Sequence, residues 1–103
     1  MVNIFLSIYL KIDIYLMLKY IFILHSGGLY LKILITDGLS KEGLDLFDKY
    51  SNLDVDVRKK TDRDELKKII NNYNAVIIRS ATKIDKEIID LINDNFKLIG
   101  RAG

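Results

Sequence analysis

Two arginines in this sequence each follow an apolar run directly. In AVIIRSATK, Arg79 and Ser80 come straight after the four apolar residues 75–78, and in FKLIGRAG Arg101 ends a second apolar run. A guanidinium offers a planar fork of N–H donors that fits a carboxylate or a phosphate at two points. The hydroxyls of Ser80 and Thr82 add further donors. These residue types predict a binding site for an anion.

The same arginines have an alternative, structural role. Arg79 and Arg101 can pair with Asp37, or with another acid, and so hold loops in place. On residue types alone this structural role is the more common one. The occurrence of two arginines at what we expect to be one edge of a sheet adds weight to the binding role, and the sequence leaves both open.

Other chemical motifs are missing from the 103 residues. There is no GxGxxG, no phosphate-binding P-loop and no cysteine, so we predict no catalytic residue, no cofactor-binding residue and no metal site. The only histidine, His25, lies beside Ser-Gly-Gly, and we assign it no chemistry. A net charge of +2 without a Lys/Arg cluster argues against a nucleic-acid partner. The acids Asp54 and Asp56 are expected on a solvent-exposed strand face.

Size and composition describe one small globular domain with an unusual beginning. Hydrophobic residues make up 50% of the chain and charged residues 29%, which is ordinary for a globular domain. The first 31 residues contain only three charged residues, Lys11, Asp13 and Lys19. These interrupt any apolar span of about 20 residues, the length that a membrane helix needs. The segment also lacks a helical period and the basic start of a signal peptide.

We therefore predict that residues 1–30 are a hydrophobic N-terminal extension outside the native fold, such as upstream sequence translated from a misplaced start. Two alternatives stay open for this segment. It associates with a membrane through residues 1–24, or it adds a strand or a helix to the domain. A cytoplasmic location is expected for the protein.

From residue 31 onward, strand patterns alternate with helix patterns. Four strands are expected, at residues 31–36, 53–57, 75–78 and 97–101. Three helices are expected between them, with N-caps at Ser40, Thr61 and Asp85, the first helix running to about Tyr50. The order βαβαβαβ implies parallel strands joined by right-handed crossovers. The predicted fold class is α/β, an open flavodoxin-like parallel sheet, with 53–57 at its edge and 75–78 in its centre.

In such sheets ligands bind outside the carboxyl ends of the strands. Asp37-Gly38, Arg79-Ser80 and Arg101 each follow or end an expected strand, so all of them should lie at this edge. The candidate substrate-binding residues are therefore Arg79, Ser80 and Arg101.

Three stretches of the sequence resemble one family. LKILITDGLSKEGLDLF, AVIIRSATKIDKEIIDLI and FKLIGRAG are similar to the start of the D-isomer-specific 2-hydroxyacid dehydrogenases, and RSATK followed by GRAG is typical of their phosphoglycerate branch. The resemblance covers residues 31–103 and implies that they form the N-terminal part of the substrate-binding domain. It also implies that Arg79 and Ser80 contact acidic groups of the substrate and that Arg101 lines the same cleft.

The resemblance further implies an activity for the intact enzyme. This would be NAD-dependent oxidation of 3-phosphoglycerate, the first step of serine biosynthesis, by a homo-oligomer. The family's nucleotide-binding domain and its catalytic Arg, Glu and His have no match in this chain. We therefore expect the chain to look like an N-terminal fragment that is inactive on its own and does not bind NAD tightly. The alternative is a non-catalytic flavodoxin-like binding or regulatory module, in one version tethered to a membrane.

Overall fold

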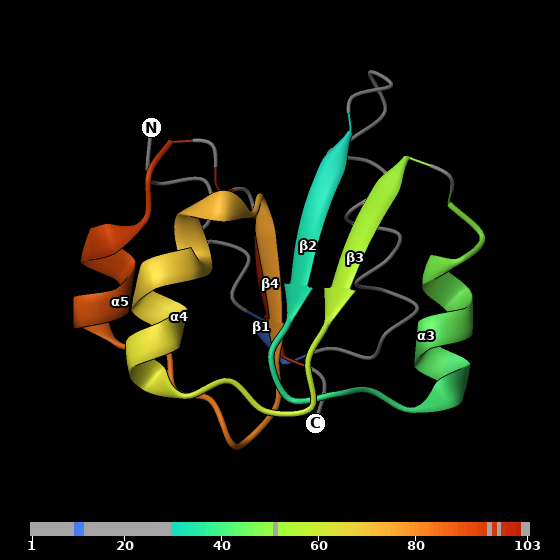
Figure 1. The fold of residues 1–103 in the computed structure, drawn as a ribbon, viewed down its shortest axis with the longest axis horizontal. Coiled ribbons are helices and arrows are strands. Elements are labelled where there is room, and N and C mark those ends of the chain that lie inside the picture. Colours follow the sequence, from blue (N-terminus) through green and yellow to red (C-terminus); the bar gives the residue numbers. More distant parts are fainter. Residues whose placement is uncertain (1–9, 12–29, 51, 95, 97, 102–103) are drawn as a thin grey trace.

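A computed structural model of the protein describes residues 10–11, 30–50, 52–94, 96 and 98–101. Within these residues five parallel strands lie in the order β1-β5-β4-β2-β3 (Figure 1). The strands are β1 Leu10–Lys11, β2 Leu31–Ile35, β3 Leu53–Val57, β4 Ala75–Ile78 and β5 Leu98–Arg101. The helices are α3 Lys41–Phe47, α4 Arg63–Ile69, the 3-10 turn η1 Ile70–Asn72 and α5 Lys86–Leu91. The predicted α/β fold with four interleaved parallel strands is confirmed.

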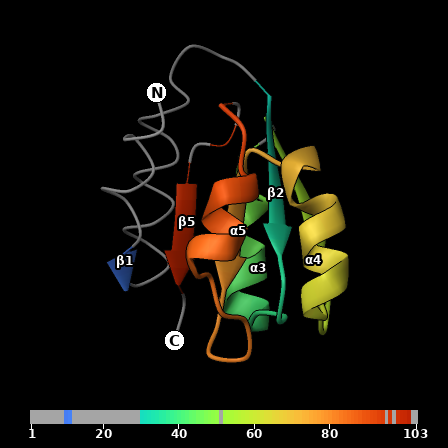
Figure 2. The same cartoon turned by 90° about the vertical axis from the view of Figure 1, so that its left-hand side faces the viewer.

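The helices cover both faces of the sheet. Figure 2 shows α5 and α4 in front of the strands and α3 behind them. The handedness of the connections accounts for this arrangement. The step from β2 to β3 runs toward one edge of the sheet, whereas the steps from β3 to β4 and from β4 to β5 run toward the other. Right-handed crossovers in opposite directions place their helices on opposite faces.

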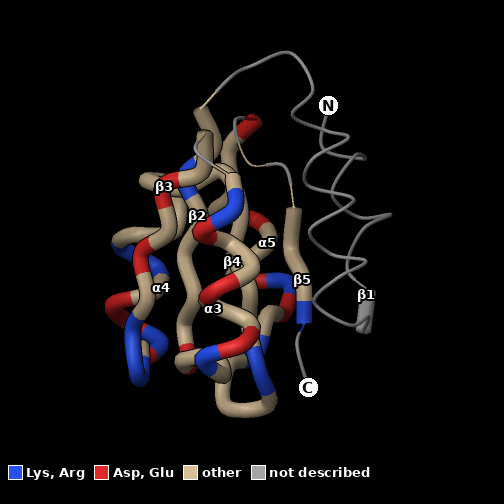
Figure 3. The backbone as a smooth tube through the Cα atoms, turned by 90° about the vertical axis from the view of Figure 1, so that its right-hand side faces the viewer, with Lys and Arg blue, Asp and Glu red and all other residues tan. Residues whose placement is uncertain are grey.

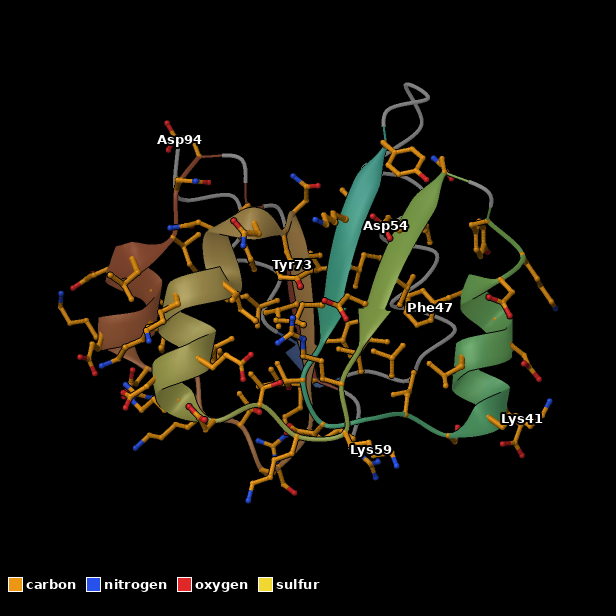
Figure 4. The ribbon with its side chains drawn as sticks, viewed as in Figure 1. Lys41, Phe47, Asp54, Lys59, Tyr73 and Asp94 are labelled. Carbon is orange, nitrogen blue, oxygen red and sulfur yellow. The ribbon has the colours of Figure 1, made fainter. Side chains whose placement is uncertain are left out.

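The burial pattern of the strands follows their position in the sheet. All four residues of β4 are buried, as predicted for a central strand, whereas β3 at the sheet edge is only partly buried. The core joins sheet residues such as Ile33 and Ile77 to one residue or more from each helix, among them Phe47, Leu66 and Ile88. Phe47 points from α3 toward β3 in Figure 4. The sheet is therefore a rigid platform for the loops at its carboxyl edge.

Two of the three predicted helix caps are confirmed, and one is wrong. The side chain of Ser40 accepts a hydrogen bond from the N–H of Gly43, and that of Asp85 accepts one from Ile88. Helix α4 is capped by Asp62, which accepts from the N–H of Glu65 at 2.9 Å. Thr61 instead turns inward and donates to the carbonyl of Thr36 at 3.1 Å. A buried carbonyl needs a donor, and Thr61 supplies it.

The predicted end of the first helix is also wrong. Helix α3 ends at Phe47 instead of reaching Tyr50. The N–H groups of Lys49 and Tyr50 donate to carbonyls three residues back, those of Leu46 and Phe47, at 3.3 and 3.1 Å. Such bonds tighten the chain into 3-10-like turns beyond the end of an α-helix.

Only a small part of the hydrophobic N-terminal segment is described. Leu10 and Lys11 form β1, which lies beside Gly100 and Arg101 of β5. Residues 1–9 and 12–29, with His25, lie outside the described residues, so the domain division at residue 30 stays a prediction. Across the described ranges, no helix combines the length and the apolarity needed to traverse a bilayer.

Candidate functional site

The two arginines that the sequence singles out lie at the carboxyl ends of neighbouring strands. Arg101 ends β5 and lies opposite Ile78 of β4, and Arg79 follows Ile78 directly. Figure 3 shows the tube turning blue at the carboxyl end of β5, where Arg101 ends the strand. Arg79 and Ser80 are exposed, and Arg101 is half-buried. The structure thus brings the predicted residues to one edge, while their contact with a ligand stays a prediction.

A short turn presents Arg79 and Ser80. The N–H of Thr82 donates to the carbonyl of Arg79 at 3.2 Å and closes the four residues 79–82 into a β-turn. Ser80 and Ala81 form the exposed middle of this turn, and Thr82 is buried at its end. The direction of the Arg79 side chain therefore depends on what holds the two ends of the turn.

One carboxylate oxygen holds both ends. Asp37 Oδ2 accepts from the hydroxyl of Thr82 at 2.7 Å and from the backbone N–H of Arg79 at 3.2 Å. It also accepts from the hydroxyl of Thr36 at 3.1 Å. Asp37 follows β2, whereas Arg79 and Thr82 follow β4, so a single side chain joins the ends of two adjacent strands.

Thr61 extends this arrangement to a third loop. Its hydroxyl donates to the carbonyl of Thr36, and the hydroxyls of Thr82 and Thr36 lie 3.0 Å apart. We call Thr36, Asp37, Thr61 and Thr82 the threonine–aspartate cluster. It links the loops that follow β2, β3 and β4 at the lower edge in Figure 1. Sequence reasoning gave Thr36 no role, and the available signal was a threonine at the end of an apolar strand.

The structural alternative expected Arg79 to form an ion pair. Within the described residues the Arg79 guanidinium forms no salt bridge, and Asp37 binds its backbone N–H instead. The loop is tied down, as that alternative expected, but by neutral donors. Among the described residues, the positive charge of Arg79 is therefore without an acidic partner, at an exposed position.

A cavity of about 250 Å³ lies beside this loop. Its lining residues are Thr61, Arg63, Leu66, Ala81, Thr82 and Lys83. Arg79 and Ser80 are not among them, and Arg63 is already bound to Asp85 and Glu87 at 2.8 Å. In the part of the chain that the structure describes, no group of three acidic, histidine or cysteine side chains is placed to hold a metal ion.

A second polar cluster lies between α4 and the sheet, as the position of Tyr73 in Figure 4 shows. We call Asp56, Arg58, Glu65 and Tyr73 the Asp56 cluster. The Tyr73 hydroxyl donates to Asp56, and Arg58 bridges Asp56 at 3.3 Å and Glu65 at 2.6 Å. Lys32 lies 5.4 Å from the centre of the Tyr73 ring. The expected exposed strand face is confirmed for Asp54, whereas the Asp56 side chain is 36% exposed and engaged by these partners.

Ionisation in the Asp56 cluster is coupled to these contacts. The hydrogen bond from Tyr73, assisted by Arg58, holds the pKa of Asp56 below its ordinary value. Burial and the bond to Asp56 raise the pKa of Tyr73. The hydrogen bond to Asp56 likewise raises the pKa of Arg58. Because the Arg58 guanidinium already has two acidic partners, Asp56 and Glu65, the cluster stabilises the fold and offers little to a ligand.

Comparison with known proteins identifies similar sequences. Residues 33–103 match the family model described as D-isomer specific 2-hydroxyacid dehydrogenase, catalytic domain. The chain is 38% identical over 73 residues to D-3-phosphoglycerate dehydrogenase of Archaeoglobus fulgidus, an alignment that covers 71% of this chain. It is 37% identical over 71 residues, 69% of the chain, to D-3-phosphoglycerate dehydrogenase 3, chloroplastic, of Arabidopsis thaliana.

A relative with a different name matches the same portion. Hydroxypyruvate reductase of Thermotoga maritima is 36% identical over 72 residues, 70% of this chain. These alignments cover only 14%, 12% and 23% of the Archaeoglobus, Arabidopsis and Thermotoga proteins. The chain thus matches less than a quarter of the length of each relative.

Proposed function

Because the chain belongs to the D-isomer specific 2-hydroxyacid dehydrogenase family, we propose that its carboxyl edge binds the acidic substrate of such an oxidoreductase. Arg79, Ser80 and Arg101 are the proposed contacts. The observation that carries the proposal is the strand register, which sets Arg101 opposite Ile78 and hence beside the Arg79 loop. Ligands of open parallel sheets bind at this edge.

The proposed substrate is 3-phosphoglycerate, which offers a carboxylate and a phosphate to the two arginines. Relatives named D-3-phosphoglycerate dehydrogenase support this choice. Each guanidinium can meet an anionic group at two points, and the Ser80 hydroxyl can donate a further hydrogen bond. Because the Thermotoga relative is named hydroxypyruvate reductase, hydroxypyruvate is a second candidate substrate to be tested.

The finer parts of the proposal concern the intact enzyme. They are oxidation of 3-phosphoglycerate with NAD, a place in serine biosynthesis, a cytoplasmic location and assembly as a homo-oligomer.

The residues present here do not fit the dinucleotide. The turn after β2 has one glycine, Gly38, and carries the carboxylate of Asp37, whereas a pyrophosphate needs a glycine-rich turn free of negative charge. The chain's part is substrate orientation alone.

A chimera tests the proposed contacts. The matched 73 residues of the Archaeoglobus enzyme are replaced by the corresponding residues of this chain, and steady-state kinetics with 3-phosphoglycerate are measured. Losing a charge-assisted hydrogen bond costs about 1.5–3 kcal/mol, so Arg79→Ala should lower kcat/KM by about one to two orders of magnitude. Most of the loss should appear in KM. Arg79→Lys should recover only part of it, because lysine lacks the fork. Arg101→Ala should act more mildly.

The matched control is Lys49→Ala, which removes one positive charge at the opposite, amino edge of the sheet, just before β3. Its kinetics should equal those of the parent chimera. If Arg79→Ala left the kinetics intact and lowered the melting temperature by many degrees, Arg79 would be structural and the proposal would be wrong.

The chain on its own should have no dehydrogenase activity. Hydride transfer needs a bound nicotinamide and a placed acid–base group, and the 103 residues contain neither a dinucleotide fingerprint nor a histidine other than His25. The measurement is NADH formation by purified chain with NAD and 3-phosphoglycerate. Turnover that disappears in Arg79→Ala would contradict this expectation.

A further inference from the structure

We propose that Asp37 is a positioning residue for the anion site: it fixes the turn at residues 79–82 so that Arg79 and Ser80 are held ready for the ligand. The inference rests on the proposed function, and it adds a residue to it that touches no ligand. Its basis is the convergence of three donors, from the ends of two adjacent strands, on one oxygen of Asp37.

The donors at Asp37 define both ends of the turn. The backbone N–H of Arg79 fixes the start, and the Thr82 hydroxyl fixes the end. A backbone contact restrains the chain itself, and hence the origin of the Arg79 side chain. Thr82 is 8% exposed, and the partner left to its hydroxyl without Asp37 is the hydroxyl of Thr36, 3.0 Å away. Removing the carboxylate would therefore free the start of the turn and leave its end with a neutral acceptor in place of a carboxylate.

Backbone hydrogen bonds hold the chain on both sides of Asp37. The N–H of Gly38 donates to the carbonyl of Arg58 at 2.7 Å, and the N–H of Arg58 donates to the carbonyl of Ile35 at 2.9 Å. Gly38 has a φ of +71°, a backbone conformation that favours glycine. The chain on either side of Asp37 is thus held between β2 and the end of β3. The turn at residues 79–82, bound to Asp37, is therefore ordered before the ligand arrives, which lowers the entropy lost on binding.

The charge of the donors to Asp37 matters as much as their number. Asp37 is satisfied by two hydroxyls and a backbone N–H, all of them neutral. The guanidinium of Arg79 is therefore not consumed by an internal ion pair among the described residues. Asp37 orders the loop and leaves the arginine charge for an external anion. A guanidinium at the same place would order the loop equally well and neutralise the acid, as Arg58 does at Asp56.

The test uses the full 103-residue chain, labelled with nitrogen-15 and titrated with 3-phosphoglycerate. The dissociation constant is read from the amide shifts of Arg79 and Ser80. Without the carboxylate the ligand must order the turn itself, so we expect Asp37→Ala, which removes the acceptor of all three bonds, to weaken binding by about tenfold. Thr82→Val, which loses the hydroxyl with little change in shape, should weaken it by several fold. Thr82→Ser should restore it.

The sign of the Asp37→Ala effect separates positioning from simple charge. Removing a negative charge near an anion site should tighten binding by Coulomb attraction alone. Positioning predicts the opposite, weaker binding. The matched control is Asp45→Ala, the same change in an exposed i,i+4 pair with Lys41 on α3, and it should leave the dissociation constant unchanged. Thermal unfolding of each variant shows how much of it is folded at the titration temperature.

The outcomes distinguish this inference from the proposed function. If Arg79→Ala binds as the parent chain does, or if the parent shows no shifts with 3-phosphoglycerate, the proposed function itself fails. If Arg79→Ala weakens binding while folded Asp37→Ala and Thr82→Val bind equally well or more tightly, only the positioning role fails. Weakening in both variants, with rescue in Thr82→Ser, supports it.

Discussion

Asp37 and Asp56 are two carboxylates on neighbouring strands with opposite kinds of partner. Asp37 follows β2 and accepts from the hydroxyls of Thr36 and Thr82 and from a backbone N–H. Asp56 lies in β3 and accepts from the Tyr73 hydroxyl and the Arg58 guanidinium. One acid meets neutral donors among the described residues, whereas the other meets a cation.

The difference between neutral and cationic partners gives the two carboxylates different roles. In an ion pair such as Asp56–Arg58 each charge has its partner within the protein, although both side chains are partly exposed. A carboxylate held by neutral donors orders a loop without neutralising a nearby arginine. Stability should therefore depend more on the Asp56 cluster, and ligand binding on the threonine–aspartate cluster.

The largest expected loss of stability is that of Asp56→Ala. The substitution leaves the Tyr73 hydroxyl and one side of the Arg58 guanidinium without their partner. The buried Tyr73 hydroxyl accounts for the cost, because the Arg58 guanidinium is open to water, so the free energy of unfolding should fall by about 1–2 kcal/mol. Urea denaturation followed by circular dichroism measures it. Binding of 3-phosphoglycerate by the folded variant should be unchanged, and a tenfold weaker affinity would erase the contrast between the two acids.

Tyr73→Phe should have a smaller effect. It removes one hydroxyl donor from Asp56 and keeps the ring beside Lys32. The expected loss is about 1 kcal/mol, and it should not add fully to that of Asp56→Ala, because both substitutions remove the bond between Tyr73 and Asp56. A double-mutant cycle in urea measures the coupling. Full additivity would show that the hydroxyl contributes nothing through Asp56.

The pH dependence sharpens the comparison further. The pKa of Asp56 is lowered in the folded state, so its contribution is present above the unfolded pKa of about 4 and is lost as the pH falls through the folded value. Stability should decline below about pH 5, and less steeply in Tyr73→Phe than in the parent chain. Asp85 and Glu87, whose pKa values are lowered by Arg63 and by Lys67, contribute equally to both proteins. Urea midpoints at pH 7, 5, 4 and 3 provide the test.

Lys41→Ala should have the smallest effect. Lys41 pairs with Asp45 at 3.1 Å, but both side chains are largely exposed. Exposed i,i+4 pairs contribute about 0.3–0.5 kcal/mol, so the urea midpoint should hardly move. A loss as large as that of Tyr73→Phe would show that surface pairs matter here as much as the Asp56 cluster.

Local patterns in the sequence were sufficient for the elements and for one edge of the sheet. The apolar run of β4 predicted a buried central strand, and Ser40 and Asp85 predicted helix starts, because strand and helix periods and caps depend on residues a few positions apart. The rule for parallel sheets then placed Arg79 and Arg101 at the same edge. That placement needed only the order of elements.

Only the tertiary structure decided what each polar group touches. Thr82 meets Thr36 and Asp37 across 46 and 45 residues, and Asp56 meets Tyr73 across 17. Thr61, expected as a cap, serves the carbonyl of Thr36 instead. A periodic pattern shows which face of an element is buried, but strand register and helix placement determine which donor meets which acceptor. Those are set by packing of the whole domain, so hydrogen-bond partners distant in sequence appear only once the chain has folded.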